Sequence, residues 1–388
     1  MPELDGADIV CVGFADWQTE IWTNQHHLMV RLARANRVLF IESLGLRRPT
    51  LTGRDLRRMA RRVRTGLSGP RKLDGVNVLS PLVLPWHGSR AAQRVNSTLL
   101  RGLVGRAARR LGFDRPILWS YVPQAESLVD VLHPSLVVYH VVDDIAAHER
   151  IDSDAFATAE AAFLKRADLV LASAPSILER LRSLGASPVY VPNVADTDLF
   201  ATALDDGPVD PGIAALPSPR AVFVGAIVGV KLDLGLLAEL AQRCEDWSFA
   251  LVGPVGLGDP TTDVSALEAL PNVHLLGARP HDALPGVLRG ADVGLVPYAS
   301  NRLTASIFPM KIYEYLAAGL PVLATNLPAL AGIEDVAVAD DSAEAAQQLV
   351  ELQRFDSPER RRERSRRAIP HSWDARIDEL RAAVAAVR

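Results

Sequence analysis

The sequence predicts an α/β protein built from two doubly wound, Rossmann-like parallel sheets. Short apolar runs alternate with helical patterns through the first half of the chain, and the alternation restarts after a Pro-, Gly- and Asp-rich segment at 203–212. With 388 residues, 48% hydrophobic and 23% charged, the chain is long enough for two cores. We expect domains at 1–200 and 201–370, and a helix at 371–388 that packs back on the first domain.

Each expected strand is an apolar run bounded by turn residues, and each expected helix shows a period near 3.6. The first half is expected to hold strands at 9–14, 37–41, 76–80, 117–121, 136–142, 169–172 and 189–191, with helices that include 24–35 and 155–166. The second half is expected to hold strands at 221–224, 249–252, 273–276, 293–296 and 322–324, with helices at 234–243, 284–289 and 311–318.

Composition narrows the class of protein. The two cysteines, Cys11 and Cys244, lie far apart and form neither a disulfide framework nor a CxxC metal motif. No leader pattern opens the chain and no run of 18 apolar residues occurs in it. We expect a cytoplasmic protein, soluble or peripheral on the inner face of the cell membrane.

The net charge of −4 conceals a basic segment at 47–72, which holds ten basic residues and one acid. From 54 to 67 the pattern is that of a basic amphipathic helix, with apolar residues opposite a face formed by Arg54, Arg57, Arg58, Arg61 and Arg62. One interpretation is binding to an anionic membrane surface, and the other is a solvated helix packed on its own domain. No aromatic residues interleave with the arginines, so nucleic acid is not an expected partner.

Residues 308–325 predict a site for a nucleoside phosphate. Pro309 suits the first turn of a helix, whose free N–H groups attract anions, and Lys311 adds a positive charge. Glu314 lies three residues after Lys311, on the same helix face, where a carboxylate can accept hydrogen bonds from a ribose diol. A strand follows, so the site lies at the edge where open α/β sheets bind ligands.

A second glycine-containing loop follows the expected strand at 221–224. Gly225 opens the loop and Lys231 closes it before a helix, which brings backbone N–H groups and a cation near a phosphate. The spacing is not that of a Walker A loop, and the turn at Gly253 is not GxGxxG. Gly225 and Gly253 are expected to contact the bound nucleotide, and a purely structural turn is the alternative.

Two further loops carry weaker signals. Arg279, after the strand at 273–276, is placed to present its guanidinium plane to a nucleobase. The segment 192–200 is either a ligand contact or an Asx turn that forms the interdomain hinge.

In the first domain, His140, Asp143 and Asp144 lie at the carboxyl end of the strand at 136–142. Acids at such an edge can hold sugar hydroxyls or assist proton transfer, and capping of the next helix is the alternative. Adjacent aspartates point apart in an extended chain, so no metal site is expected. Gln25, His26 and His27 begin the expected helix at 24–35 and face the same edge. One of these histidines is a candidate contact for a phosphate or for an acceptor substrate, and a histidine on the surface without such a role is the alternative.

Taken together, these motifs resemble the GT-B glycosyltransferases, in particular the family 4-like enzymes (glycosyl transferases group 1). The similarity covers most of the chain and is most specific at 167–173, 192–200, 223–231 and 309–325. It implies two Rossmann-like domains facing a central cleft, with the nucleotide sugar on the C-terminal domain and the acceptor on the other. By the same resemblance, Lys231 matches the phosphate-binding lysine and Glu314 the glutamate on the donor ribose.

The sequence departs from the family pattern at two positions. Ser306 stands where many members carry the first glutamate of an EX7E pair, and Ala226 and Ile227 replace the basic residue after the first loop glycine. The form Pro-x-Lys-x-x-Glu-Tyr resembles a subgroup that assembles teichuronic acid and other surface polysaccharides.

The resemblance implies transfer of a sugar from a nucleoside diphosphate to a hydroxyl of a glycan or lipid-linked acceptor in cell-envelope polysaccharide synthesis. Lysines and helix N–H groups can neutralise the departing diphosphate, so no metal or other cofactor is expected to be required. Two alternatives stay open at this point: a GT-B-type nucleotide-sugar epimerase, and a non-catalytic partner that binds glycan or membrane.

Overall fold

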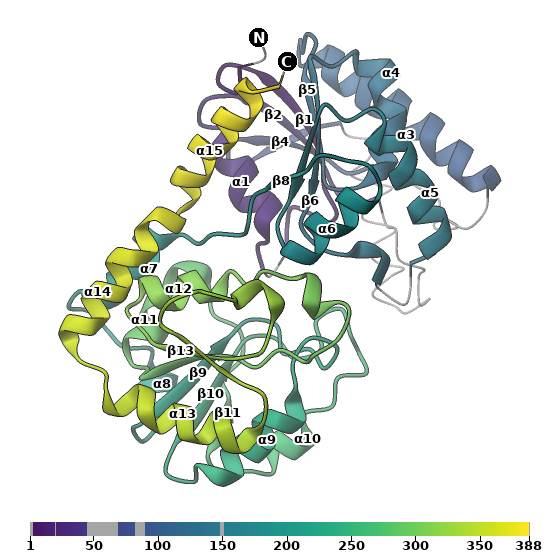
Figure 1. Cartoon of the computed structure of the whole chain (residues 1–388). Helices are drawn as coiled ribbons and strands as arrows, with labels where there is room; N and C mark the ends of the chain where they lie inside the picture. The colour runs from purple at the N-terminus through teal and green to yellow at the C-terminus, as the bar shows by residue number, and fades with distance from the viewer. Residues whose placement is uncertain (1–2, 20, 45–68, 82–89, 148–150, 388) are drawn as a thin grey trace. The chain divides into compact units, whose positions relative to one another are not determined.

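The computed structural model describes residues 3–19, 21–44, 69–81, 90–147 and 151–387. The chain forms two compact units, shown in Figure 1. Unit 1 comprises Met1–Pro192 and Arg376–Arg388, and unit 2 comprises Asn193–Ala375. The basic residues Arg54, Arg57, Arg58, Arg61 and Arg62 lie outside the described residues, so the amphipathic helix predicted there stays a prediction.

Unit 1 is organised around an eight-stranded sheet, as far as its residues are described, in the order β3-β4-β2-β1-β5-β6-β7-β8. All neighbours are parallel except β3, which joins the edge antiparallel to β4. The strands are β1 (Asp8–Val12), β2 (Arg37–Ile41), β3 (Arg71–Leu73), β4 (Val76–Leu79), β5 (Ile117–Ser120), β6 (Leu136–Val141), β7 (Leu169–Ala172) and β8 (Val189–Tyr190). The winding direction reverses between β1 and β5, and α/β sheets bind ligands at such points.

Helices cover both faces of this sheet. One face shares its apolar core with α3, α5 and α6, and the other packs against α1 and the part of α15 that belongs to unit 1. Their bounds are α1 (Asn24–Leu32), α3 (Arg90–Arg110), α4 (Val129–Leu132), α5 (Ser153–Leu164), α6 (Pro175–Ser183) and α15 (Trp373–Ala385), with 3-10 turns η1 (Pro123–Leu128) and η2 (Ile145–Ala147).

Unit 2 contains a fully parallel six-stranded sheet in the order β11-β10-β9-β12-β13-β14. The strands are β9 (Arg220–Val224), β10 (Ser248–Val252), β11 (Val273–Leu275), β12 (Val293–Val296), β13 (Val322–Thr325) and β14 (Val336–Ala339). Chain order reverses between β9 and β12, which defines the topological switch point of this unit.

One face of the second sheet is covered by α9 and α13, and the other by α7, α11, α12 and α14. Their bounds are α7 (Thr197–Ala201), α8 (Pro211–Ala214), α9 (Leu234–Arg243), α10 (Ser265–Glu268), α11 (Leu284–Arg289), α12 (Lys311–Ala317), α13 (Ser342–Arg354) and α14 (Pro358–Ala368), with 3-10 turns η3 (Thr202–Leu204), η4 (His281–Ala283), η5 (Thr304–Ser306), η6 (Pro328–Leu330) and η7 (Ile369–His371). The α/β fold with two parallel sheets is confirmed.

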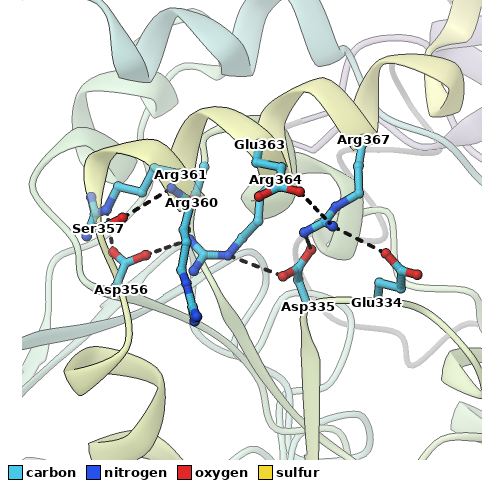
Figure 2. A network of polar contacts seen from close by, with 10 residues as sticks. Glu334, Asp335, Asp356, Ser357, Arg360, Arg361, Glu363, Arg364 and Arg367 are labelled. Atoms are coloured by element: carbon cyan, nitrogen blue, oxygen red, sulfur yellow. Dashed lines mark hydrogen bonds and ion pairs between the residues drawn. The ribbon is translucent and has the colours of Figure 1, made fainter.

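Figure 2 shows a network of ion pairs that joins α14 to the rest of unit 2, with buried Arg364 among its members. The Arg364 guanidinium contacts Asp356 at 2.7 Å and Asp335 at 3.6 Å, and its Nη1 also donates to the carbonyl of Gly319 at 2.7 Å. Arg367 adds an ion pair to Asp335. Gly319 follows α12, so α14 holds the C-terminal end of the helix that carries Lys311.

The segment at 203–212, expected to be a linker or a loop just after one, belongs to unit 2. Three carbonyls of this region accept hydrogen bonds from the Arg289 guanidinium, from Nη2 to Thr202 at 2.7 Å, from Nε to Asp205 at 3.1 Å and from Nη1 to Pro208 at 2.6 Å. The change from unit 1 to unit 2 occurs earlier, between Pro192 and Asn193.

Candidate functional site

Two loops meet at the switch point of unit 2. The loop from Gly225 to Lys231 follows β9, and the loop that begins at Pro297 follows β12. The Ala299 amide donates to the Lys231 carbonyl at 2.8 Å, and the Asn301 side chain donates to the Val230 carbonyl at 2.9 Å. These bonds fix the shape of the Gly225–Lys231 loop without using the Lys231 ammonium group.

Two glycines allow the backbones after β9 and β10 to approach closely. Gly225 has φ +144° and Gly253 has φ +157°, values that L side chains rarely adopt. A Cβ atom on Gly253 would overlap the carbonyl oxygen of Gly225. The amide of Gly225 donates to the carbonyl of Val252 at 2.8 Å. The predicted contacts Gly225 and Gly253 are therefore neighbours at the carboxyl edge of the sheet.

Lys311 is brought against the same backbone. A Cβ atom built on Gly225 would lie 2.8 Å from Lys311 Nζ, so the ammonium group lies directly over this glycine. Nζ also lies 5.8 Å from the centre of the Phe223 ring. Within the residues that the structure describes, no carboxylate forms an ion pair with Lys311. A cation without a counter-charge, placed over a glycine backbone at a switch point, is suited to bind an anion.

Glu314 lies one turn further along α12. Its side chain is only 9% exposed, and its carboxylate makes no hydrogen bond or ion pair to any described residue. A partly buried carboxylate retains unused acceptors that a ligand hydroxyl can satisfy. Pro309 is buried and precedes the helix, which begins at Lys311 with Met310 as N-cap, rather than forming its first turn as predicted. Ser306 is buried at the end of η5, and its Oγ donates to the Arg302 carbonyl at 3.4 Å.

Tyr315 is a positioning residue that the sequence analysis did not single out. Its fully buried hydroxyl accepts a hydrogen bond from the Val224 amide at 2.8 Å, immediately before Gly225. Its ring packs over Gly294 of β12, where a Cβ atom would overlap it. Burial raises the pKa of Tyr315 well above its ordinary value, so the hydroxyl stays protonated. Tyr315 thereby fixes the distance between α12 and the loop after β9.

The two remaining predicted contacts of unit 2 differ in their surroundings. Lys231 is half-buried in a turn before α9, at the far end of the loop from Gly225. Arg279 is bound to Asp210 at 2.7 Å and also donates to the Leu276 carbonyl at 2.7 Å, so its guanidinium secures the start of α8. Asn193 is buried and donates from its amide to the carbonyl of Phe308, which ties the 192–200 segment to the loop before α12.

The predicted acceptor-side residues of unit 1 are all buried, not on the surface. Gln25 accepts a hydrogen bond from the Phe14 amide at 2.9 Å. His26 Nδ1 lies 3.1 Å from the Thr23 amide, and Nε2 lies 3.0 Å from the Asp16 carbonyl, so both ring nitrogens take part in local structure. Burial lowers the pKa of His26. His27 packs edge-on against Trp22.

His140 lies at the end of β6 on the face that α1 and α15 cover. It is 1% exposed and stacks on Tyr121 with ring centres 5.0 Å apart, and no described atom bonds to either ring nitrogen. Burial, followed by the charge of Arg376, lowers the pKa of His140 from 6.5 to about 3. The imidazole is therefore neutral at physiological pH. Asp144 is also buried, whereas Asp143 is half-buried.

We expect His140 to make unit 1 less stable in mild acid. Its lowered pKa means that the unfolded chain binds a proton that the folded chain rejects, so stability is complete above the unfolded pKa and falls as pH drops below it. From about pH 7 to about pH 5 this amounts to about 2 kcal/mol. Denaturant unfolding at both pH values should show that His140→Phe loses less free energy of unfolding on acidification than the wild type does. His274→Asn, at a half-exposed histidine, is the control and should lose as much as the wild type. An equal loss in His140→Phe and the wild type would contradict the prediction.

Whole-chain structural similarity defines the fold class. The structure matches a sucrose-phosphate synthase from Thermosynechococcus elongatus with a TM-score of 0.66 and 17% identity, covering 98% of this chain and 100% of that one. It also matches Anabaena HepE, solved in complex with UDP-glucose, with a TM-score of 0.66 and 15% identity over 98% and 100% of the two chains. The fold is that of GT-B glycosyltransferases.

Sequence similarity to known proteins covers a smaller part of the chain than structural similarity does. Residues 218–354 match the family model described as glycosyl transferases group 1. A protein of Bacillus subtilis (strain 168), described as a teichuronic acid biosynthesis glycosyltransferase, TuaH, is 32% identical over 180 residues. That match spans 44% of this chain and 43% of the relative, less than half of each.

None of the described helices combines the length and apolar character that a bilayer span needs. No group of three or more His, Cys, Asp or Glu side chains in the described part is arranged to hold a metal ion.

Proposed function

We propose that this chain is a glycosyltransferase that takes a sugar from a nucleoside diphosphate sugar and transfers it to a hydroxyl of a glycan or lipid-linked acceptor. The observation that carries the proposal is the ammonium group of Lys311, which lies over Gly225 at the switch point of unit 2 and forms no ion pair with any residue that the structure describes. The group 1 match over 218–354 supports it, because this range contains every residue of that site.

In the proposed mechanism, Lys311 and the amides of the Gly225–Lys231 loop stabilise the negative charge that grows on the departing diphosphate. Lys231 approaches the same phosphates from the other end of the loop. Glu314 accepts hydrogen bonds from the ribose hydroxyls and thereby orients the nucleotide. Two lysines near the leaving group supply the charge that a divalent ion would otherwise supply, so we propose that transfer needs no metal.

The acceptor is proposed to bind unit 1. Gln25, His26 and His27 lie at the start of α1 after β1, and Asp143 and Asp144 follow β6, so both groups come after the carboxyl ends of strands near the reversal of winding between β1 and β5. His140, buried and neutral, is proposed to support this edge by packing and not by moving a proton. The name of the Bacillus relative favours a cell-envelope polysaccharide as the acceptor class, and the basic segment 47–72 is proposed to contact the anionic membrane where such acceptors are assembled.

The test is turnover with a panel of UDP-, GDP-, ADP- and dTDP-sugars, each with lipid-linked and soluble glycan acceptors, with magnesium and with a chelator. We expect release of one nucleoside diphosphate that depends on the acceptor and is unchanged by the chelator. Isomerisation of the nucleotide sugar without release of nucleotide would replace the proposal with an epimerase. Absence of binding and turnover across the panel would favour a non-catalytic partner.

A further inference from the structure

The outer face of α3 carries a second group of basic residues, which lies outside the segment 47–72 in the sequence. The helix Arg90–Arg110 carries six arginines and no acidic residue. Five of these arginines are described as exposed: Arg94, Arg101, Arg106, Arg109 and Arg110. None of the five forms an ion pair with a described residue. A helix of this length without an acidic residue concentrates positive potential on one side of unit 1.

Two exposed apolar residues lie among these arginines. Val95 is 44% exposed and Leu99 is 39% exposed. Val95, Leu99 and Gly102 follow one another at spacings of four and three, so they share one stripe of the helix, and Arg106 continues it. A Cβ atom on Gly102 would meet nothing within 4 Å, which shows that the stripe is open at this point.

The opposite side of α3 is a genuine core face. Leu100, Val104, Ala107 and Ala108 belong to the apolar core of unit 1, and a Cβ atom on Gly105 would lie 2.8 Å from Val131 of α4. This face therefore anchors the helix to the core of unit 1. Its exposed apolar residues do not arise from a failure to pack.

Asp130 of α4 and Glu126 of η1 both pair with Arg166, at 2.8 Å and 3.6 Å. The pKa of Asp130 is lowered by Arg166 and, to a smaller extent, by the charge of Arg101. Arg101 therefore has an acidic neighbour, whereas Arg94, Arg106, Arg109 and Arg110 form no ion pair with a described residue and keep their charge available for a partner.

We propose that the outer face of α3 docks on an anionic lipid bilayer. Arginines attract anionic headgroups, and valine and leucine placed between them can enter the headgroup region, which is the composition of an interfacial helix. The apolar stripe favours a bilayer over a nucleic acid, because duplex phosphates offer no apolar layer and α3 presents no aromatic side chain for stacking. This inference rests on the membrane contact in the proposed function and adds a second surface for it, and docking itself does not require that sugar transfer occurs.

The test is co-sedimentation of the full chain with vesicles of equimolar phosphatidylcholine and phosphatidylglycerol, and with vesicles of phosphatidylcholine alone. One variant combines Arg106→Glu, Arg109→Glu and Arg110→Glu. Its matched control combines Arg360→Glu, Arg362→Glu and Arg366→Glu, which makes the same change of charge at exposed positions of α14 in unit 2. We expect the α3 variant to bind anionic vesicles about a hundredfold more weakly than the control.

A second variant, Val95→Ser with Leu99→Ser, should reduce the binding that survives high salt. Both α3 variants leave residues 47–68 unchanged. If that segment alone bound the vesicles, the triple α3 variant would bind them as well as its α14 control does. That result would overturn the inference. Equal binding of the wild type to the two vesicle types would also overturn it, as would binding to duplex DNA without binding to vesicles.

Nucleotide-sugar affinity is measured on the same proteins and should be the same in the wild type and in both α3 variants. A chain that docks through α3 but binds no nucleotide sugar would contradict the proposed function and leave this inference standing. If nucleotide sugar binds equally well to all variants but charge reversal on α3 leaves vesicle binding unchanged, this inference is contradicted and the proposed function stands.

Discussion

Gly253→Ala is expected to destabilise unit 2 by about 3 kcal/mol or more, because the new methyl group meets fixed backbone. At φ +157° the Cβ atom would overlap the carbonyl oxygen of Gly225, and neither strand end can move without breaking the bond from the Gly225 amide to Val252. Thermal and denaturant unfolding of the full chain measure the change.

Gly277→Ala is the matched control for this prediction. Gly277 also has a positive φ, +71°, but a Cβ atom there meets nothing within 4 Å. It should therefore show only the cost of the backbone conformation, about 1 kcal/mol. Equal destabilisation by the two substitutions would show that the close approach of the two glycine turns is not what restricts Gly253.

Gly225→Ala is expected to weaken nucleotide binding and also to cost stability, because L side chains rarely adopt its φ of +144°. The added Cβ atom would overlap Lys311 Cε and lie 2.8 Å from Nζ, and the flexible end of that side chain can move away. Displacing the ammonium group removes a charged hydrogen bond to phosphate, so nucleotide affinity should fall roughly ten- to hundredfold. Gly229→Ala, in the same loop with its nearest neighbours 3.8 Å away, should bind nucleotide like the wild type. Equal affinity in both variants would separate Lys311 from the phosphate site.

Most strands of the two sheets were predictable because they are short, largely buried apolar runs. Arg37–Ile41, Leu169–Ala172 and Val293–Val296 match the expected ranges, and the other predicted strands differ by one or two residues at their ends. The edge strands β3 and β14 were not predicted, and most of their residues are only half-buried or exposed. The helix Arg90–Arg110 escaped prediction, because its core face uses small residues such as Ala107 and Ala108 between many arginines. Such a face gives a weak apolar period.

The positions of Lys311 and Glu314 on one helix were predictable, whereas their part in binding a nucleotide stays a prediction. The i, i+3 spacing of Lys311 and Glu314 places both on one face of α12, and the structure finds them there. Sequence spacing cannot show that Tyr315 bonds to the Val224 amide, because that contact joins residues far apart in the chain. The same limit applies to His140, where the strand position was evident and complete burial was not.

Calorimetric titration of the nucleotide sugar that the panel identifies, into the wild type, Lys311→Met and Glu314→Gln, tests the central claim most directly. Lys311→Met keeps the side-chain length and removes the charge, so its affinity should fall roughly ten- to hundredfold while the unfolding transition stays in place. Glu314→Gln should weaken binding by a smaller factor. Wild-type affinity in both variants would contradict the assignment of Lys311 and Glu314 to the nucleotide.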